Sequence, residues 1–148
     1  MWNSMKSVQL SLICTKVVIF LVIVCAIIMP TRIARYIDLL PIELSVLYPF
    51  MAILYLCCIP AMAALICLHM LLVNIKREEV FIRKNVKLLR IISWCCFLAA
   101  FIMAFAIYYY LLFGLMAVAV AFIGLILRVV KNVIEEAVRL KDENDFTI

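Results

Sequence analysis

The sequence predicts an all-α membrane protein with four transmembrane helices, both termini in the cytoplasm, and an amphipathic C-terminal extension of the fourth helix. Of the 148 residues, 70% are hydrophobic, whereas roughly half of a soluble domain is apolar. A soluble core of this size could not bury so many apolar side chains, and the exposed ones would aggregate. Strict apolar–polar alternation is missing, so helices rather than barrel strands are expected to satisfy the backbone in lipid.

Uncharged stretches locate the spans, because a bilayer core accommodates about 20 apolar helical residues. The stretch from Val8 to Met29 is interrupted only by Lys16, and Leu44–Ile75 carries no charge. The uncharged stretch Ile91–Leu127 is long enough for two spans, and Gly114 is the expected site of the reversal because glycine tolerates turn dihedrals. Residues 1–148 are therefore expected to form one membrane domain, with spans at residues 8–29, 45–74, 86–113 and 115–130.

The first span has a basic start and an apolar stretch, as a signal peptide does. Its apolar stretch is nevertheless long, contains Lys16, and lacks a small-x-small cleavage site before Pro30. We therefore expect a retained helix, in which Lys16 either snorkels to the membrane surface or faces another helix.

The distribution of basic residues sets the predicted orientation. The loop at residues 75–90 holds two acids and six basic residues: Lys76, Arg77, Arg83, Lys84, Lys87 and Arg90. The first loop has equal numbers of basic and acidic residues, and the third has no charge. The positive-inside rule then places the loop 75–90, both termini and the tail at residues 131–148 on the cytoplasmic side of the plasma membrane.

The tail is expected to continue the fourth helix with a polar and an apolar stripe, because both residue types recur at steps of three and four. The polar stripe is Arg128, Asn132, Glu135, Arg139 and Asp142. The apolar stripe is Val130, Val133, Ala137 and Leu140. The apolar stripe is expected to cover the membrane surface, the basic loop of the same chain or another protein. The tail acids can pair with that basic loop, or both segments can bind a partner. On one continuous helix, four basic residues of the loop would share a face: Lys76, Arg83, Lys87 and Arg90.

These two segments form the predicted partner-binding site. Its residues are Arg83, Lys84, Asn85, Lys87, Arg90, Glu136, Arg139, Asp142, Glu143, Asp145, Phe146 and Ile148. The last residues, "DFTI", can dock through their side chains and the terminal carboxylate. A simpler reading of the basic residues is that they stop transfer and bind anionic lipid headgroups.

The segments "VFIRKNVKLLRIISW" and "EEAVRLKDENDFTI" resemble the signatures of a family of small bacterial four-helix membrane proteins of unassigned function. In that family a Phe followed by Asn-Val and a basic run introduces the third span, and an acidic stretch ending in Asp-x-Thr-Ile closes the chain. The matching residues are Phe81, Asn85, Val86, Leu89, Arg90, Leu140, Asp145, Thr147 and Ile148. Val80 and Ile82 replace the family's usual Pro and hydroxyl residue, so the helix start is expected to differ.

The resemblance also implies a partner, since members of that family are often encoded beside a small helix-turn-helix regulator of the Cro/C1 type. The expected function is non-enzymatic tethering of such a regulator through the basic loop and the acidic tail. Immunity to a membrane-active peptide, through residues 32–43 and the spans, is an alternative. A small oligomeric transporter is another, although no acid lies within a span to carry cations.

No catalytic motif is found, so an enzyme, a cofactor and a metal are not expected. The seven cysteines lie in or near spans without a C-x-x-C motif, and we interpret them as small apolar packing residues. The single histidine, His69, is expected to be a hydrogen-bonded packing residue. Beyond the lipid bilayer and a regulator, a homo-oligomer is compatible with the sequence. Direct nucleic-acid binding is not expected, because the basic run is short and juxtamembrane.

Overall fold

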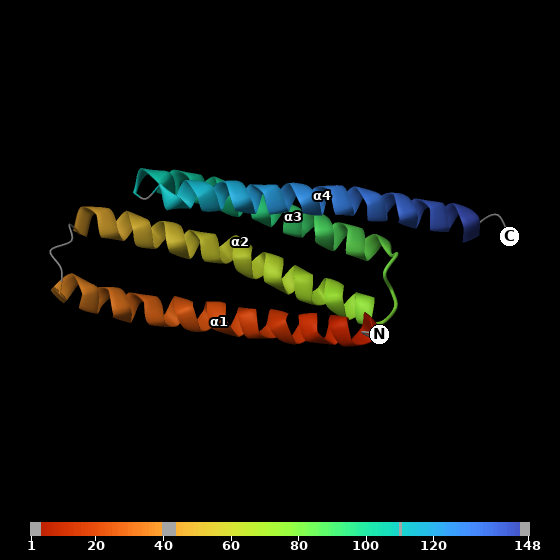
Figure 1. The fold of residues 1–148 in the computed structure, drawn as a ribbon, viewed down its shortest axis with the longest axis horizontal. Helices are drawn as coiled ribbons and strands as arrows, with labels where there is room; N and C mark the ends of the chain where they lie inside the picture. Colours follow the sequence, from red (N-terminus) through yellow and green to blue (C-terminus); the bar gives the residue numbers. More distant parts are fainter. Residues whose placement is uncertain (1–3, 40–43, 110, 146–148) are drawn as a thin grey trace.

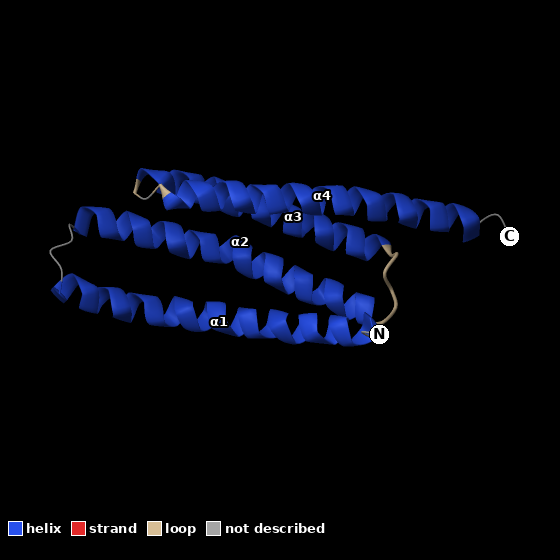
Figure 2. Cartoon of the chain, viewed as in Figure 1, coloured by secondary structure: helices blue, strands red, loops and turns tan. Residues whose placement is uncertain are grey.

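The computed structural model describes residues 4–39, 44–109 and 111–145, with side chains except at residues 4–5, 33–39, 44–47, 50 and 145. The described chain is helical apart from its turns (Figure 2). It consists of α1 (Ser4–Leu39), α2 (Leu44–Lys76), α3 (Arg83–Phe105), the short 3-10 helix η1 (Ala106–Tyr108) and α4 (Leu112–Asp145). Within the described residues, four helices are long and apolar enough to cross a membrane, which confirms the prediction of an all-α membrane protein with four spans. The chain is therefore a multi-pass membrane protein.

Helices that are consecutive in the sequence are neighbours in space. The main contacts join α1 to α2, α2 to α3, and α3 to α4, and Figure 1 shows α1 and α2 on one side of the molecule with α3 and α4 on the other. The start of α1, the α2–α3 connection (residues 77–82) and the end of α4 lie at the same end of the molecule (Figure 1). We call this end the basic end.

A cluster of buried apolar side chains lies near the basic end. Leu71 of α2 and Leu88 and Leu89 of α3 form its centre. Partly buried side chains surround them: Cys67, Leu68, Ile75, Leu127 and Ile134. Elsewhere many large apolar side chains are exposed, as lipid permits, including Phe20 at 69% and Phe122 at 62%. Lipid can therefore cover the outer faces while protein packing concentrates on α2, α3 and α4.

α1 extends beyond its predicted end at Met29 and continues through Pro30 to Leu39. Proline cannot donate the helical hydrogen bond to the carbonyl of Ala26, four residues earlier. The hydroxyl of Tyr55 in α2 donates to that carbonyl instead, at 2.9 Å. The freed carbonyl is thus satisfied by a neighbouring helix, so the proline does not end α1. Residues 31–39, which lie between the predicted spans 8–29 and 45–74, are therefore helical. Residues 40–43 separate α1 from α2 and lie outside the described residues.

The reversal between α3 and α4 is also misplaced in the prediction. The chain turns at Tyr109–Leu111, of which Tyr110 is not described, and Gly114 lies inside α4. A Cβ atom at Gly114 would come within 3.1 Å of Ile107 Cγ1. Gly114 thus allows close packing beside the turn rather than supplying turn dihedrals.

The basic loop is shorter than the predicted 75–90, because α2 continues to Lys76 and α3 begins at Arg83. Lys76 therefore does not share one continuous helix with Arg83, Lys87 and Arg90. α2 ends in a left-handed residue, Glu78, whose φ is 65°. The amide of Glu78 donates to the carbonyl of Ile75, at 3.0 Å, and the amide of Glu79 donates to that of Asn74, at 3.1 Å. These bonds form a Schellman-type end.

α3 and α4 approach each other closely at Gly124. The Ser93 hydroxyl donates to the Gly124 carbonyl at 2.9 Å, and both residues are buried. A Cβ atom at Gly124 would lie 3.1 Å from Cys96 Cβ. Because Gly124 has no side chain, α3 and α4, which carry the predicted site, can approach each other this closely.

Candidate functional site

Asn85 is the most deeply buried large side chain of the predicted site, at 1% exposure. Its amide nitrogen donates to the carbonyls of Glu79 and Val80, at 2.7 and 2.9 Å. Its amide oxygen accepts a hydrogen bond from Asn74 of α2, at 2.7 Å. Asn85 therefore joins the α2–α3 connection to both helices. Its buried side chain cannot meet a soluble partner, so its role is structural rather than that of a contact residue.

This network also explains how α3 starts without a conventional cap. Ile82 occupies the N-cap position and offers no side-chain hydrogen bond. The backbone amide of Asn85 donates to the Ile82 carbonyl at 3.0 Å, and the Asn85 side chain holds the preceding backbone. The start of α3 is thus fixed by Asn85 rather than by a side-chain cap at Ile82.

The end of α4 packs along the first turns of α3. Val86 of α3 and Val138 of α4 are buried, at 6% and 5% exposure. On one side of this apolar contact, Arg83 donates to Asp142 from Nη2 at 2.8 Å and from Nε at 3.2 Å. The two segments that were predicted to form the site therefore contact each other within the chain.

A second ion-pair cluster lies nearer the membrane. Glu135 accepts from Lys131 at 2.6 Å and from Arg90 at 3.3 Å. Hydrogen bonding from Lys131, together with the charges of Lys131 and Arg90, holds the pKa of the Glu135 carboxyl below its ordinary value despite some opposing desolvation. Glu135 therefore carries its charge at neutral pH and links α4 to α3.

Between these ion pairs runs a groove of about 320 Å³. Six charged and two apolar side chains line it: Arg83, Val86, Lys87, Arg90, Glu135, Val138, Arg139 and Asp142. We call it the α3–α4 groove. It brings together five of the predicted site residues, namely Arg83, Lys87, Arg90, Arg139 and Asp142.

The remaining predicted residues lie around the groove or outside the described part of the chain. Glu136 and Glu143 are exposed on α4, where both pair with Arg139. Lys84 is exposed on α3, and neither Lys84 nor Lys87 forms an ion pair within the described residues. The side chain of Asp145 and all of Phe146 and Ile148 lie outside the description, so their predicted role is not addressed by the geometry.

The predicted apolar stripe of the tail does not pack on the rest of the described chain, so of the alternatives left open by the sequence it does not cover the basic loop. Val133 and Leu140 are 63% and 56% exposed. The side that packs on the molecule is instead offset around the helix and includes Leu127, Ile134 and Val138. We call the set Val130, Val133, Ala137 and Leu140, of which Ala137 alone is half-buried, the outer stripe.

Four residues of the site were not predicted from the sequence: Asn74, Lys131, Glu135 and Val138. Nothing in the sequence indicates that Asn74 or Lys131 belongs to the site, since each resembles an ordinary polar residue at the end of a span. The four-residue spacing of Lys131 and Glu135 was the available clue to their ion pair. A step of four, from Ile134 to Val138, was the corresponding clue to the packed face.

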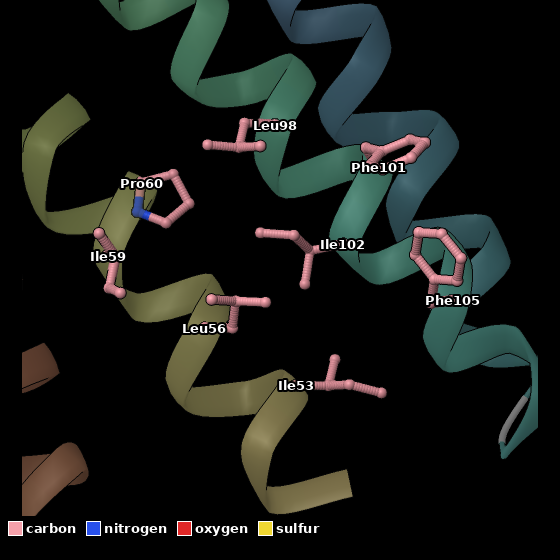
Figure 3. A pocket seen from close by; sticks show the side chains of 8 residues that line it. All are labelled: Ile53, Leu56, Ile59, Pro60, Leu98, Phe101, Ile102 and Phe105. Atoms are coloured by element: carbon pink, nitrogen blue, oxygen red, sulfur yellow. The ribbon is translucent and has the colours of Figure 1, made fainter. Parts of the chain in front are cut away.

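A separate crevice of about 430 Å³ lies between α2 and α3 (Figure 3). In Figure 3, Pro60 and neighbouring side chains of α2 face Leu98, Ile102 and the aromatic rings of α3. Every lining residue is apolar: Ile53, Leu56, Ile59, Pro60, Leu98, Phe101, Ile102 and Phe105. The crevice offers no group for acid–base chemistry or for binding a polar substrate, and its lining matches the hydrocarbon of lipid chains.

The described residues contain no group of three or more His, Cys, Asp and Glu side chains that could hold a metal ion. The seven cysteines are free thiols. His69 differs from the hydrogen-bonded packing residue that was expected: its Nδ1 atom is buried and has no hydrogen-bond partner in the described structure.

Comparison with known proteins agrees with the resemblance seen in the sequence. A family model described as "Protein of unknown function (DUF2975)" matches residues 34–148, and the chain belongs to this family. No curated protein and no solved structure matches the chain. The bacterial origin and the neighbouring helix-turn-helix regulator stay predictions.

Proposed function

We propose that this family member is a non-enzymatic protein of the plasma membrane that holds a small helix-turn-helix regulator against the cytoplasmic surface. The outer stripe and the charged residues beside it form the binding surface. The excess of basic residues at the basic end supports a cytoplasmic position for that end, by the positive-inside rule.

The observation that carries the proposal is the length and exposure of α4. Its 34 residues extend for about 51 Å at 1.5 Å per residue, whereas the hydrocarbon of a bilayer is about 30 Å thick. The uncharged part of α4 ends at Leu127, so the excess length lies mainly beyond it. Val133 and Leu140 remain exposed on this projecting part. Apolar side chains that the rest of the described protein leaves exposed on such a projecting helix are typical of an interaction surface.

The ion pairs of the site support a rigid surface rather than a loose tail. Asp142 and Glu135 hold the projecting part of α4 against α3, so a partner need not order this helix when it binds. Charged residues flank the outer stripe: Glu136 is three residues after Val133, and Glu143 is three residues after Leu140. They fit a partner that combines an apolar patch with basic residues, as a DNA-binding protein does.

Binding between two purified components tests the proposal. The full chain is placed in lipid nanodiscs and titrated with the purified small helix-turn-helix regulator that the family resemblance predicts beside its gene. Replacing Val133 and Leu140 together by Asp is expected to weaken binding at least about tenfold, the typical effect of losing central apolar contacts. Asn132→Asp is the matched control, because it adds a carboxylate beside Val133 without removing an apolar contact. The affinity of this variant for the regulator should stay within about twofold of the wild-type value.

The proposal is wrong if the regulator does not bind wild-type nanodiscs, or if it binds equally to nanodiscs without the protein. It is also wrong if the Asn132→Asp control and the double variant lose affinity to the same extent, because the effect would then report added negative charge alone.

A further inference from the structure

We propose that the crevice between α1 and α2 at the basic end binds a phosphate group, either that of an acidic phospholipid headgroup or a free phosphate anion. This inference does not depend on regulator binding. It assigns a role to Lys16 and His69, two residues that lie outside the α3–α4 groove.

The crevice has a volume of about 390 Å³. Leu12 and Lys16 line it from α1, and His69, Val73, Lys76 and Arg77 line it from α2 and the turn that follows. Lys16 and Lys76 also line an adjoining pocket together with Gln9. Lys16, the one charge within the predicted first span, therefore faces α2 rather than open lipid.

The charges of the crevice are not balanced within the chain. Three cationic side chains line it and no carboxylate does. Among the described residues, Lys16, Lys76 and Arg77 form no ion pair. The α3–α4 groove is different, since its Arg83 and Arg90 are paired with acids. Like charges repel more strongly near a low-dielectric membrane than in water, so an anion bound between these three would be stabilised.

The position of the crevice matches the level of lipid phosphates. Lys16 is the charge on α1 that precedes the uncharged stretch Val17–Thr31, and Lys76 is the charge that follows the uncharged stretch Leu44–Ile75 of α2. Both lysines therefore mark the membrane boundary on their helices. Basic pockets between transmembrane helices at this depth bind anionic headgroups.

The lining residues also supply hydrogen-bond donors for a phosphate and apolar contacts for a lipid chain. Two ammonium groups and a guanidinium can donate to phosphate oxygens, and the guanidinium can do so with two parallel bonds. The imidazole of His69 has no hydrogen bond at Nδ1, so turning that nitrogen toward a phosphate would break no existing bond there. Leu12 and Val73 offer apolar contacts to the glycerol and upper acyl chain of a lipid.

Native mass spectrometry of the full-length, delipidated protein in detergent tests the inference. The probes are phosphatidylglycerol, phosphatidylcholine and inorganic phosphate, each added separately and in competition. Wild-type protein should retain phosphatidylglycerol in preference to phosphatidylcholine. The double variant Lys16→Gln/Lys76→Gln should lower that preference by roughly 10- to 30-fold, the effect expected for two basic residues at a membrane surface.

The matched control is Lys6→Gln/Lys141→Gln, which removes two exposed lysines that do not line the crevice and should leave the preference unchanged. If the double variant does not fold, Lys76→Gln alone, at an exposed position, should lower the preference for phosphatidylglycerol by about fivefold. If inorganic phosphate displaces phosphatidylglycerol and binds in the same lysine-dependent way, the natural ligand is a soluble phosphate. If only the lipid binds, the natural ligand is a lipid headgroup. Equal retention of both lipids without phosphate binding, or equal losses in the crevice and control variants, would overturn the inference.

Discussion

Two side chains, Asn85 and Tyr55, make contacts at the residue scale that their positions in the sequence do not reveal. Asn85 bonds Asn74 of α2 and two carbonyls of the connection that precedes it. Tyr55 satisfies the Ala26 carbonyl that Pro30 leaves free. In both cases a polar group that would otherwise be unpaired is satisfied from another part of the chain. Such groups are costly to leave without a partner, so both contacts should be measurable in stability.

We expect Asn85→Ala to destabilise the protein by about 1–3 kcal/mol, because it leaves the Asn74 amide and the two carbonyls without their partner. Reversible unfolding in detergent, followed by circular dichroism, measures the difference. Lys84→Ala is the control, since it changes the adjacent exposed side chain and should shift stability by less than about 0.5 kcal/mol. Equal stability of the Asn85→Ala variant and wild type would show that the network contributes nothing.

Replacing Tyr55 by Phe removes one hydroxyl and keeps the ring. The expected loss is about 0.6 kcal/mol and at most about 2 kcal/mol, the range for hydrogen bonds between transmembrane helices. The same unfolding measurement applies. In the Pro30→Ala background the Ala26 carbonyl regains its helical partner, so the Tyr55→Phe effect should shrink there. An undiminished effect in that background would contradict the proposed link between the proline and the tyrosine.

At the scale of elements, the pairing of α3 with α4 organises the basic end. Gly124 sets their separation within the membrane, and Glu135 and Asp142 join them beyond it. The two glycines of the chain differ in what surrounds them. A Cβ atom at Gly124 meets the Cβ atom of Cys96, which is fixed to the backbone, whereas one at Gly114 meets the flexible end of Ile107.

Gly124→Ala should therefore be more destabilising than Gly114→Ala. The first substitution must move α3 and α4 apart, with a cost of about 1–3 kcal/mol for overpacking, while a small rotation of Ile107 accommodates the second. Parallel unfolding curves of the two variants test this order. If Gly114→Ala proves the more harmful, the close approach at Gly124 does not govern the pairing.

The link through Glu135 should weaken in acid. Because its pKa is lowered in the folded protein, its contribution is fully present above the ordinary glutamate pKa and is lost as the pH falls through the lowered value. The difference in unfolding midpoint between wild type and Glu135→Gln should thus be constant near neutral pH and should shrink in acid. A difference that grows on acidification would have the wrong sign for this account.

The packed face of α4 could not be predicted from the sequence. The apolar periodicity of the tail identified an amphipathic helix, but the stripe chosen from it is largely exposed and the packed face is offset around α4. In a helix that leaves lipid, apolar residues face either lipid or protein, and the hydrophobic pattern does not distinguish the two. Only the position of α3, set by Gly124 and Ser93, decides which face is buried.

At the scale of the whole molecule, the helices pack mainly in sequence order, and this leaves α1 with α2 as its main neighbour. The number of spans was predictable because uncharged stretches report directly on lipid contact. The extent of α1 was not, because the tolerance of Pro30 depends on a hydroxyl from another helix. The turn before α4 was misplaced because a glycine can serve close packing as well as a turn. The predicted basic and acidic segments do meet, but which residues pair could not be read from composition.

The projecting part of α4 gives the whole molecule its proposed role, which is to hold a soluble regulator at the membrane. The distribution of the fluorescently tagged regulator between membrane and cytosol, in living cells, tests this claim most directly. The regulator should lie at the membrane with the wild-type chain and with Asn132→Asp, and in the cytosol with Val133→Asp/Leu140→Asp, while the chain itself stays membrane-bound in all three. A regulator whose distribution is the same with all three chains, and in cells that lack the chain, would contradict the account.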